Sequence, residues 1–365
     1  MDRAGTILHC IPSMSGGGAE RQLAYLAAEL RAFGWTVHVA LWRRGPNWAR
    51  LERSGAVIHE MTARHAYDPA LLSALRRVLS DAKPDVVQTW LLQMDILGGA
   101  AALLTRTPWI VSERSEAGAY PLSLKNVIRS RLVRRADAVV SNSPAGDDYW
   151  RTRLSQRGRR FIVPNAIPLD EIAAVPGPTA GPRSGEPVVM FAGRLAAEKN
   201  IAMLLAGLSI LWTRRRVQVW CFGEGPLKAM VDRWASTLPA DRGFHAKGYA
   251  PDLWPMMKQA SVLVSPSVFE GAPNVVLEAM ACGVPLVVSD IPAHRELLDA
   301  ESAMLVDASS PVLLADAIDA VLQDPIGAAR RAAVALRRAA RFDLRATARR
   351  YDDMYRDVIS QRVAG

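Results

Sequence analysis

Two glutamates stand eight positions apart in the stretch VFEGAPNVVLEAMACGVP, residues 268–285. Glu270 lies in a Glu-Gly-Ala turn, and Glu278 lies about one turn into a short helix that Pro273 and the following apolar run predict. Carboxylates accept hydrogen bonds from hydroxyl groups, and the start of a helix favours a negatively charged group. The pattern therefore indicates a ligand that carries both hydroxyls, as in a sugar or ribose, and phosphate.

Two cations follow an earlier strand-like run in FAGRLAAEKN, residues 191–200. Arg194 comes directly after the predicted strand, and Lys199 opens the next predicted helix. Two cations at one such turn can converge on a single phosphate group. They can also stabilise the negative charge that develops on a departing phosphate.

A third candidate site follows the first predicted strand, TILHCIP, where Gly16, Gly17 and Gly18 lead into a predicted helix over residues 19–33. Glycines let the backbone come close to a ligand, and a helix start offers N–H groups to an anion. The spacing differs from G-x-G-x-x-G, so it does not indicate a dinucleotide cofactor.

All three candidate sites follow strands in a chain whose short apolar strands alternate with helices. This alternation predicts parallel sheets covered on both faces, in which ligands bind at the carboxyl ends of the strands. A chain of 365 residues exceeds the usual size of one hydrophobic core, and residues 166–187 contain five prolines and three glycines. We therefore expect an α/β protein of two doubly wound, Rossmann-like domains facing each other across a cleft. The predicted boundaries are 1–168, a linker at about 169–186, 187–345, and a terminal helix at 346–365.

The positive charge is concentrated in the first half of the chain. Residues 1–170 carry 23 Lys and Arg against 15 Asp and Glu, whereas residues 171–365 carry 22 against 21. This excess indicates an anionic partner such as a phospholipid, a nucleic acid or a phosphorylated substrate, although a generic basic surface would give the same count. Residues 124–136 predict a basic amphipathic helix that could face an anionic membrane. Its cations are Lys125, Arg129, Arg131, Arg134 and Arg135.

Neither a secretory signal nor a membrane-spanning run is predicted, because the apolar run near the N-terminus is too short and no run of about 18 apolar residues occurs. The three scattered cysteines, Cys10, Cys221 and Cys282, fit reduced thiols in a cytosolic protein. We expect a cytoplasmic protein, with peripheral attachment to the inner face of the cytoplasmic membrane as a further hypothesis.

Several motifs together resemble the retaining glycosyltransferases of the GT-B fold, specifically the large glycosyltransferase family 4. The resemblance covers nearly the whole chain, and SPSVFEGAPNVVLEAMACGVPLVVSD, which contains the E-x7-E pair, is its most specific part. FAGRLAAEKN is similar to the family's phosphate motif, GGGAERQLAYLAAELRAFGWTVHV to its opening, and IVPNAIP to its VIPNGID-type sequence. RYDDMYRDVI is similar to the closing helix that returns to the first domain.

The resemblance implies a role for each candidate residue. Arg194 and Lys199 would bind the diphosphate of a nucleotide sugar, Glu270 would contact the donor sugar, and Glu278 would bind ribose. The catalytic residues would be Glu270, Arg194 and Lys199. The donor-binding residues would be Gly17, Gly18, Arg194, Lys199, Gly223, Lys247, Gly248, Tyr249, Glu270, Gly271, Ala272, Pro273, Asn274, Val275 and Glu278. The residues on the acceptor or donor-sugar side would be Gly16, Trp90, Glu113 and Arg114.

The sequence departs from the family in its first domain. Members often carry a histidine after the fourth or fifth strand, where this chain has Gln88-Thr89-Trp90 and Ser112-Glu113-Arg114. We expect Glu113 or Arg114 to occupy that space. Ala166 stands where the family usually has glycine after Asn165.

No cofactor or metal is expected, because the chain has no D-x-D tripeptide and its six histidines show no ligand spacing. The expected function is retaining, metal-independent transfer of a hexose or N-acetylhexosamine from a nucleotide sugar. UDP-sugar is favoured and GDP-mannose is the alternative donor. The acceptor would be a lipid-linked glycan or another saccharide in bacterial surface polysaccharide or glycolipid synthesis, and no nucleic acid partner is expected.

Two other functions remain open at this point. A nucleotide-sugar epimerase of similar build would need no acceptor surface, but the Arg-Lys and E-x7-E pairs argue against it. A non-enzymatic binder of anionic lipid or nucleic acid would use the basic first half, and would leave Arg194, Lys199 and Glu270 without a function.

Overall fold

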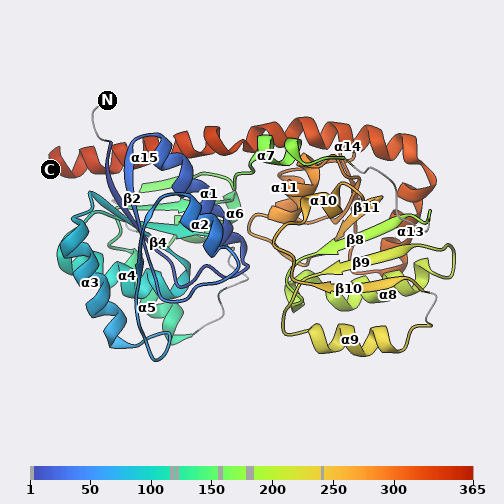
Figure 1. The fold of residues 1–365 in the computed structure, drawn as a ribbon, viewed down its shortest axis with the longest axis horizontal. Helices are drawn as coiled ribbons and strands as arrows, with labels where there is room; N and C mark the ends of the chain where they lie inside the picture. Colours follow the sequence, from blue (N-terminus) through green and yellow to red (C-terminus); the bar gives the residue numbers. More distant parts are fainter. Residues whose placement is uncertain are drawn as a thin grey trace. The chain divides into compact units, whose positions relative to one another are not determined.

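The computed structural model describes residues 4–115, 120, 123–154, 159–177, 185–239 and 242–364. The chain divides into two compact units, one formed by Met1–Ala166 with Leu344–Gly365 and the other by Ile167–Asp343 (Figure 1). Each unit contains one parallel sheet with helices on both faces. The predicted α/β class and the two doubly wound parallel sheets are confirmed.

The sheet of the first unit has seven strands in the order β3-β2-β1-β4-β5-β6-β7. Its strands are β1 (Gly5–Cys10), β2 (Trp35–Leu41), β3 (Val57–Glu60), β4 (Val86–Trp90), β5 (Trp109–Glu113), β6 (Ala138–Ser141) and β7 (Arg159–Ile162). Its helices are α1 (Gly18–Ala32), α2 (Trp48–Arg53), α3 (Pro69–Ala82), α4 (Leu91–Thr105), α5 (Leu124–Val133), α6 (Pro144–Arg151) and α15 (Leu344–Ala364).

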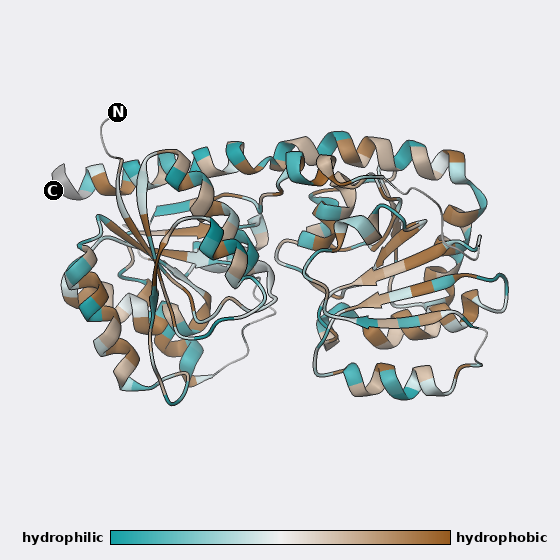
Figure 2. Ribbon diagram, in the orientation of Figure 1, coloured by the Kyte–Doolittle hydropathy of each residue, from teal (hydrophilic) through white to brown (hydrophobic). Residues whose placement is uncertain are grey.

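Alternate residues of these strands enter two separate cores, as the period of two in a strand requires. Ile7 packs with side chains of α1 and α15 on one face, whereas Leu8 and Cys10 pack with side chains of α3 and α4 on the other. The strands are accordingly apolar along most of their length (Figure 2). Their polar residues gather towards the carboxyl ends, where His9, Gln88 and Glu113 are all fully buried.

The C-terminal helix α15 completes the first of these cores. Ala348, Tyr351, Met354 and Tyr355 are buried in it. The Tyr355 hydroxyl also donates to Gln88 of β4. Because α15 supplies large buried side chains, residues 344–364 are part of the fold of the first unit, although they are far from it in the sequence.

The sheet of the second unit has six strands in the order β10-β9-β8-β11-β12-β13. Its strands are β8 (Val188–Ala192), β9 (Gln218–Phe222), β10 (Phe244–Gly248), β11 (Val262–Ser265), β12 (Leu286–Ser289) and β13 (Met304–Val306). Its helices are α7 (Leu169–Ala174), η2 (Ala197–Lys199), α8 (Ile201–Leu211), α9 (Lys228–Ser236), α10 (Trp254–Met257), α11 (Asn274–Ala281), α12 (Pro292–Arg295), α13 (Pro311–Gln323), α14 (Pro325–Ala339) and η3 (Ala340–Phe342).

The second sheet also lies between two cores. Side chains of α8 and α13 cover one face, and side chains of α7, α10, α11 and α14 cover the other. Helix α7 falls within the range in which the proline-rich sequence predicts a linker, and its Ile172 is buried in the second unit. Residues 178–184 of that range lie outside the described residues.

A buried ionic cluster joins α4, α5 and β5 in the first unit. Arg129 of α5 donates to Asp95 of α4 at 2.7 Å and to Glu113 of β5 at 2.9 Å, and the side chains of all three are at most 2% exposed. Thr89 also donates to Asp95 at 2.7 Å. Burial raises the pKa of Asp95 to about 6, even though Arg129 and Thr89 favour its ionised form. The cluster depends on the one guanidinium that two buried carboxylates share.

Arg129→Met removes this guanidinium and leaves two buried carboxylates without their cation. We expect the free energy of unfolding to fall by about 3–5 kcal/mol, the usual cost of breaking a buried ion pair. Urea denaturation followed by circular dichroism measures the change. Arg131→Met, at an exposed position of the same helix, is the matched control and should stay within about 0.5 kcal/mol of the parent.

The difference in the free energy of unfolding between the parent and Arg129→Met should become smaller as the pH is lowered. Protonation of Asp95 removes one of the two buried negative charges that the variant leaves without a cation. Equal losses of stability in the two variants would show that the cluster does not hold the unit together.

Candidate functional site

In the second unit, the backbone after β8 lies against the backbone after β9. Gly193 donates to the Phe222 carbonyl at 3.0 Å, and Leu195 donates to the Glu224 carbonyl at 2.9 Å. Gly223 has a positive φ of 139°, and a Cβ at this position would lie 1.9 Å from the Gly193 carbonyl oxygen. Only glycine fits at position 223, so the chain presents bare backbone at this point of the sheet edge.

Arg194 and Lys199 follow β8 as predicted, but the two side chains differ from each other in exposure and in their ion-pair partners. The Arg194 side chain is 66% exposed and pairs with Glu198 at 2.7 Å. The Lys199 side chain is only 21% exposed, and its Nζ pairs with Oε1 of Glu270. Two of the predicted catalytic residues, 71 positions apart, are therefore in direct contact.

Glu270 is held from one side only. Ser267 donates to its Oε1 at 2.7 Å, and Lys199 reaches the same oxygen. Within the described residues no donor reaches Oε2. One carboxylate oxygen is therefore fixed by the protein, while the other can accept a hydrogen bond from a ligand.

A second layer of polar contacts supports the loop that carries Glu270. The Ser289 hydroxyl donates to the Ser267 carbonyl at 2.6 Å. The Nδ1 of His294 lies 2.7 Å from the Ser289 carbonyl and so donates to it. Burial lowers the pKa of His294, so the ring is neutral near pH 7. Val268 N–H also donates to the Glu198 carbonyl at 2.9 Å, which ties this loop to the Arg194–Lys199 turn.

Sequence reasoning missed Ser267, Ser289 and His294 as parts of this site. Ser267 lies three residues before Glu270, and that spacing is a usable signal for a local hydrogen bond. Ser289 and His294 follow the next strand of the sheet. Nothing in their local sequence marks them, because their role depends on the pairing of β11 with β12.

Helix α11 begins at Asn274, next to the Glu270 turn, and its N-cap is Pro273. Gly271 and Ala272 between them are half-buried. The positive end of the helix dipole therefore lies beside the Lys199–Glu270 pair. Glu278 is only 1% exposed and lies on the side of α11 that packs into the unit.

Three predicted residues lie at the end of β10. Lys247 is exposed, with its Nζ 5.9 Å from the centre of the Trp220 ring, whereas Gly248 and Tyr249 are half-buried. The Gly248 carbonyl accepts from the N–H of Gly223 at 2.8 Å, which places this turn beside the end of β9. Predicted donor-binding residues from β8, β9, β10 and β11 therefore follow the carboxyl ends of one sheet.

In the first unit, the glycines that follow β1 form an exposed loop. Gly16, Gly17 and Gly18 are all exposed, and Gly17 is the N-cap of α1. Ser15 donates to Glu20 at 2.5 Å, and a Cβ on Gly17 would lie 2.4 Å from the other Glu20 oxygen. The absence of a side chain at position 17 lets the loop fold tightly over the start of α1.

Glu113 is fully buried, and both of its oxygens accept hydrogen bonds. Oε2 accepts from Arg129 at 2.9 Å and from Trp150 at 2.8 Å. Oε1 accepts from Tyr120 at 2.6 Å and from the backbone N–H groups of Arg114 and Ser115 at 2.9 Å each. Because all of these donors surround the buried carboxylate, Glu113 stabilises the loop at the end of β5 and is not open to solvent.

Arg114 points to the opposite face of the sheet and is half-buried. Its guanidinium lies 4.8 Å from the centre of the Trp90 ring and donates to Asn165 at 2.7 Å. Trp90 itself is fully buried and donates to His9 at 3.2 Å. Of the residues predicted on the acceptor or donor-sugar side, Arg114 and Gly16 have accessible surface, whereas Trp90 and Glu113 do not.

The basic helix α5 differs from its prediction at one residue. Arg129 does not belong to the exposed basic face, because it is buried between Asp95 and Glu113. Lys125, Arg131, Arg134 and Arg135 are exposed. Leu124 and Ile128 beside them are 75% and 38% exposed. The described part of α5 therefore presents cations together with apolar side chains.

Two searches of the described residues found nothing. No group of three or more His, Cys, Asp or Glu side chains lies close enough together to hold a metal ion. Similarly, none of the helices in this part of the chain has the length and apolar character needed to cross a bilayer.

Two family models match the chain, one on each unit. Residues 17–166 match the glycosyl transferase 4-like domain, and residues 186–324 match the glycosyl transferases group 1. The chain is also 26% identical over 278 residues to the lipopolysaccharide core biosynthesis glycosyltransferase LpsE of Rhizobium meliloti, covering 74% of this chain and 75% of that protein.

A second relative is an alpha-1,4-N-acetyl-D-galactosaminyltransferase of Campylobacter jejuni, named for a PP-undecaprenol-linked glycan. The two are 25% identical over 283 residues, which is 74% of this chain and 75% of that enzyme. Among solved structures, HepE of Anabaena in complex with UDP-glucose superposes with a TM-score of 0.82 and 18% identity, covering 98% of this chain and 100% of HepE.

The motifs, the two parallel sheets and these matches agree with one another. The chain belongs to the group 1, glycosyltransferase 4-like family, and it is a nucleotide-sugar glycosyltransferase of the GT-B fold.

Proposed function

We propose that this glycosyltransferase moves a hexose or N-acetylhexosamine, with retention of configuration and without a metal, from a UDP-sugar to a lipid-linked or other saccharide acceptor. GDP-mannose is the alternative donor. The product would belong to bacterial surface polysaccharide or glycolipid synthesis. LpsE and the C. jejuni enzyme, which are named for such products, support this assignment, and the UDP-glucose complex of HepE supports a UDP-sugar.

The observation that carries the proposal is the geometry around Glu270. Lys199 and Ser267 hold Oε1, so Oε2 remains to accept a hydroxyl of the donor sugar. An ammonium group has three protons, so Lys199 can keep its pair with Glu270 and still donate to a phosphate oxygen. Sugar and phosphate would thus be bound by two residues that already touch.

Arg194 supplies the second cation. The Arg194 side chain in its pair with Glu198 is 66% exposed, and ion pairs at such exposed positions contribute only about 0–1 kcal/mol. The guanidinium can therefore turn to a diphosphate at small cost. Together with the start of α11, Arg194 and Lys199 would stabilise the charge on the leaving group, which is the task of a divalent metal in many other enzymes.

The proposed reaction exchanges one bond at the anomeric carbon. The acceptor oxygen forms a bond to this carbon on the face that the diphosphate leaves, and the bond between the carbon and the phosphate oxygen breaks. The proton of the acceptor hydroxyl passes to an oxygen of the departing phosphate. The nucleoside diphosphate leaves with both electrons of the broken bond, and Arg194 and Lys199 hold its charge.

The remaining predicted residues have supporting roles in the proposal. Gly223, Gly248 and the 271–275 segment would bring backbone close to the nucleotide sugar. Glu278 is only 1% exposed, so its predicted contact with ribose requires the bound nucleotide to reach this buried carboxylate. Lys247 and Tyr249 would lie near the base. From the first unit, Gly16–Gly18 and Arg114 would contact substrate directly. Glu113 and Trp90 would position Arg114, because one bonds its backbone N–H and the other lies against its guanidinium.

The donor site can be tested by calorimetric titration of EDTA-treated protein with UDP and, separately, with GDP. We expect one nucleotide to bind, and Arg194→Ala to weaken that binding by about tenfold or more, because a charge-assisted contact is lost. Arg356→Ala is the matched control, since Arg356 forms a similar i,i+4 pair with Asp352 at 2.8 Å. If neither nucleotide bound, the donor site would be wrongly assigned.

The leaving-group role predicts a loss of turnover in Lys199→Ala. We expect kcat to fall by about 10²-fold or more, because a cation aimed at the developing charge is removed. Release of nucleotide from UDP-glucose, UDP-N-acetylglucosamine and GDP-mannose gives the rate. Lys228→Ala, which removes a lysine with an exposed Asp232 pair, should leave the rate unchanged.

The same assay tests whether turnover requires a divalent metal. The parent rate should be equal in EDTA and in Mg²⁺ or Mn²⁺. A rate that disappeared in EDTA and returned with Mn²⁺ would contradict the metal-independent part of the proposal.

A lipid-linked acceptor would bring the exposed face of α5 to an anionic membrane. Replacing Lys125, Arg131, Arg134 and Arg135 with Gln should reduce co-sedimentation with phosphatidylglycerol vesicles, since each cation contributes about 1 kcal/mol near such a surface. The control replaces four exposed arginines of the same unit, Arg31, Arg53, Arg76 and Arg77. Equal loss in both variants would indicate a general charge effect and would exclude α5 as the membrane face.

A further inference from the structure

The nearly neutral charge of the second half of the chain conceals a strongly basic segment. Residues 325–342, which form α14 and η3, contain five arginines and no Asp, Glu or Lys. Acidic residues elsewhere in the second half balance this charge in the total. The segment is therefore a local source of positive potential that a count over the half-chain does not detect.

The packing of α14 turns these arginines outwards. Ala328, Ala332, Ala335 and Ala339 form the buried face of the helix, and α14 packs against α11. On the other faces, Ile326 and Leu336 are 84% and 44% exposed. The exposed surface of α14 therefore combines arginines with apolar side chains.

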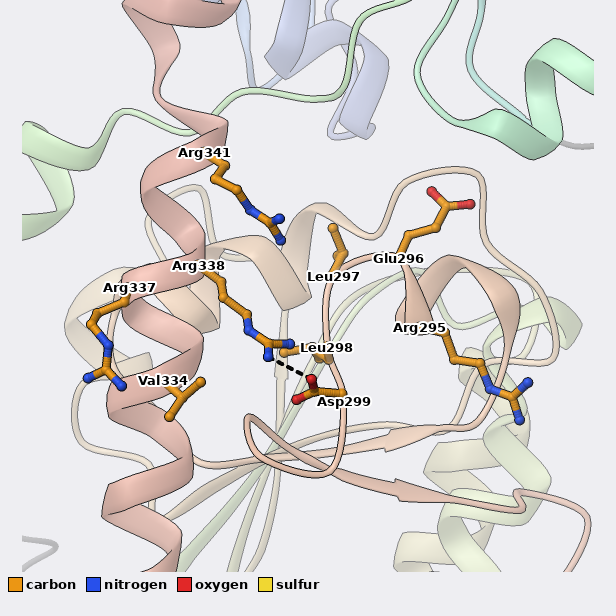
Figure 3. Close-up of a pocket in the computed structure, with 9 residues that line it drawn as sticks. All are labelled: Arg295, Glu296, Leu297, Leu298, Asp299, Val334, Arg337, Arg338 and Arg341. Atoms are coloured by element: carbon orange, nitrogen blue, oxygen red, sulfur yellow. Dashed lines mark hydrogen bonds and ion pairs between the residues drawn. The ribbon is translucent and has the colours of Figure 1, made fainter.

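A cavity of about 580 Å³ lies at the C-terminal end of α14 (Figure 3). It is bounded by α14 and η3 on one side and by the segment that follows α12 on the other. Its lining combines four arginines, two acidic residues and three aliphatic residues. They are Arg295, Glu296, Leu297, Leu298, Asp299, Val334, Arg337, Arg338 and Arg341.

The arginines of this cavity are not equally neutralised. Arg338 pairs with Asp299 at 2.6 Å and donates to Ser302 at 3.2 Å, which fixes its guanidinium. Arg295 pairs with Asp290 at 2.5 Å and points away from the cavity (Figure 3). Within the described residues, neither Arg337 nor Arg341 forms an ion pair with a carboxylate.

Figure 3 shows how the unneutralised charge is placed. Arg341 extends from η3 towards the segment that carries Leu297, on the same side as Arg338, whereas Arg337 lies along the outer side of the helix at the rim. Arg338 and Arg341 are three residues apart, so their side chains are neighbours on the helical surface. A fixed guanidinium therefore stands beside a free one at the mouth of the cavity.

Helix electrostatics explain only part of this arrangement. Cations near the C-terminus of a helix are favourable, which accounts for Arg337 and Arg338 in the last turn of α14. Arg341 lies beyond the end of α14, and like charges three or four residues apart repel each other. A bound anion would remove this repulsion.

We propose that this cavity binds a phosphate group, held by Arg338 and Arg341 with Arg337 at the rim. Guanidinium groups offer forked pairs of N–H donors that match phosphate oxygens. The phosphate belongs either to a lipid headgroup, whose acyl part would meet the exposed Leu336, or to a soluble compound. The site is separate from the Arg194–Lys199–Glu270 cluster and does not depend on the proposed donor.

The test is calorimetric titration with inorganic pyrophosphate, performed on full-length protein that carries Arg194→Ala and Lys199→Ala so that the proposed nucleotide site does not contribute. In this background we expect one binding event. Adding Arg337→Gln and Arg341→Gln should weaken it by at least about tenfold, because two guanidinium contacts are lost.

The matched control adds Arg330→Gln and Arg331→Gln, which remove the same charge from the same helix outside the cavity lining. This control should change the affinity by less than about twofold, and circular dichroism should show that both variants are folded. Absence of pyrophosphate binding in the background, or equal weakening in the two variants, would overturn the proposal.

Once pyrophosphate binding has been established, co-sedimentation with vesicles shows whether the phosphate belongs to a lipid headgroup or to a soluble compound. Wild-type protein and the Arg337→Gln/Arg341→Gln variant are sedimented with phosphatidylcholine vesicles, with and without phosphatidic acid. Loss of both pyrophosphate and vesicle binding would assign the site to a lipid phosphate. Loss of pyrophosphate binding alone would assign it to a soluble one.

Discussion

The ion pair between Lys199 and Glu270 is the contact on which the second unit's site depends. It joins the turn after β8 to the turn after β11, and a backbone hydrogen bond from Val268 to Glu198 fixes the same two loops. Both side chains are largely buried, and such groups are costly unless they are paired. Satisfying Glu270 therefore requires Lys199, and this requirement places a cation, a carboxylate oxygen and the start of α11 next to one another.

The two units use carboxylates for opposite purposes. Glu270 leaves one oxygen available, because its two protein donors share the other. Glu113 accepts five hydrogen bonds over both oxygens and is fully buried. The first arrangement can bind a ligand, while the second fixes the loop that presents Arg114. A glutamate at the end of a parallel strand can serve either purpose, and the number of donors around it decides which.

The position of each arginine says more about where an anion could bind than the number of arginines in a segment does. Arg129 belongs to the basic first half, yet it is neutralised in the interior by Asp95 and Glu113. Arg337 and Arg341 belong to the nearly neutral second half, yet neither forms an ion pair with a carboxylate among the described residues. Net charge over a long segment sums positions whose dielectric surroundings and neighbours differ, so it cannot locate an anion-binding surface.

The sequence by itself determined the fold class, and it predicted the positions at which a ligand would contact the chain. Apolar strands alternating with helices require parallel sheets, and parallel sheets gather the ends of their strands at one edge. The glycines, Arg194, Lys199 and the E-x7-E pair could be read directly, because each of these signals is local.

Tertiary structure decided which of these residues touch and which are accessible. Arg129 lies in the 124–136 segment with four exposed cations, and only the placement of Asp95 and Glu113 on neighbouring elements buries it. Ser289 and His294 support the Glu270 loop through the pairing of β11 with β12, which no local pattern encodes. Burial and contact depend on residues far away in the chain, and a pattern within one segment carries no record of them.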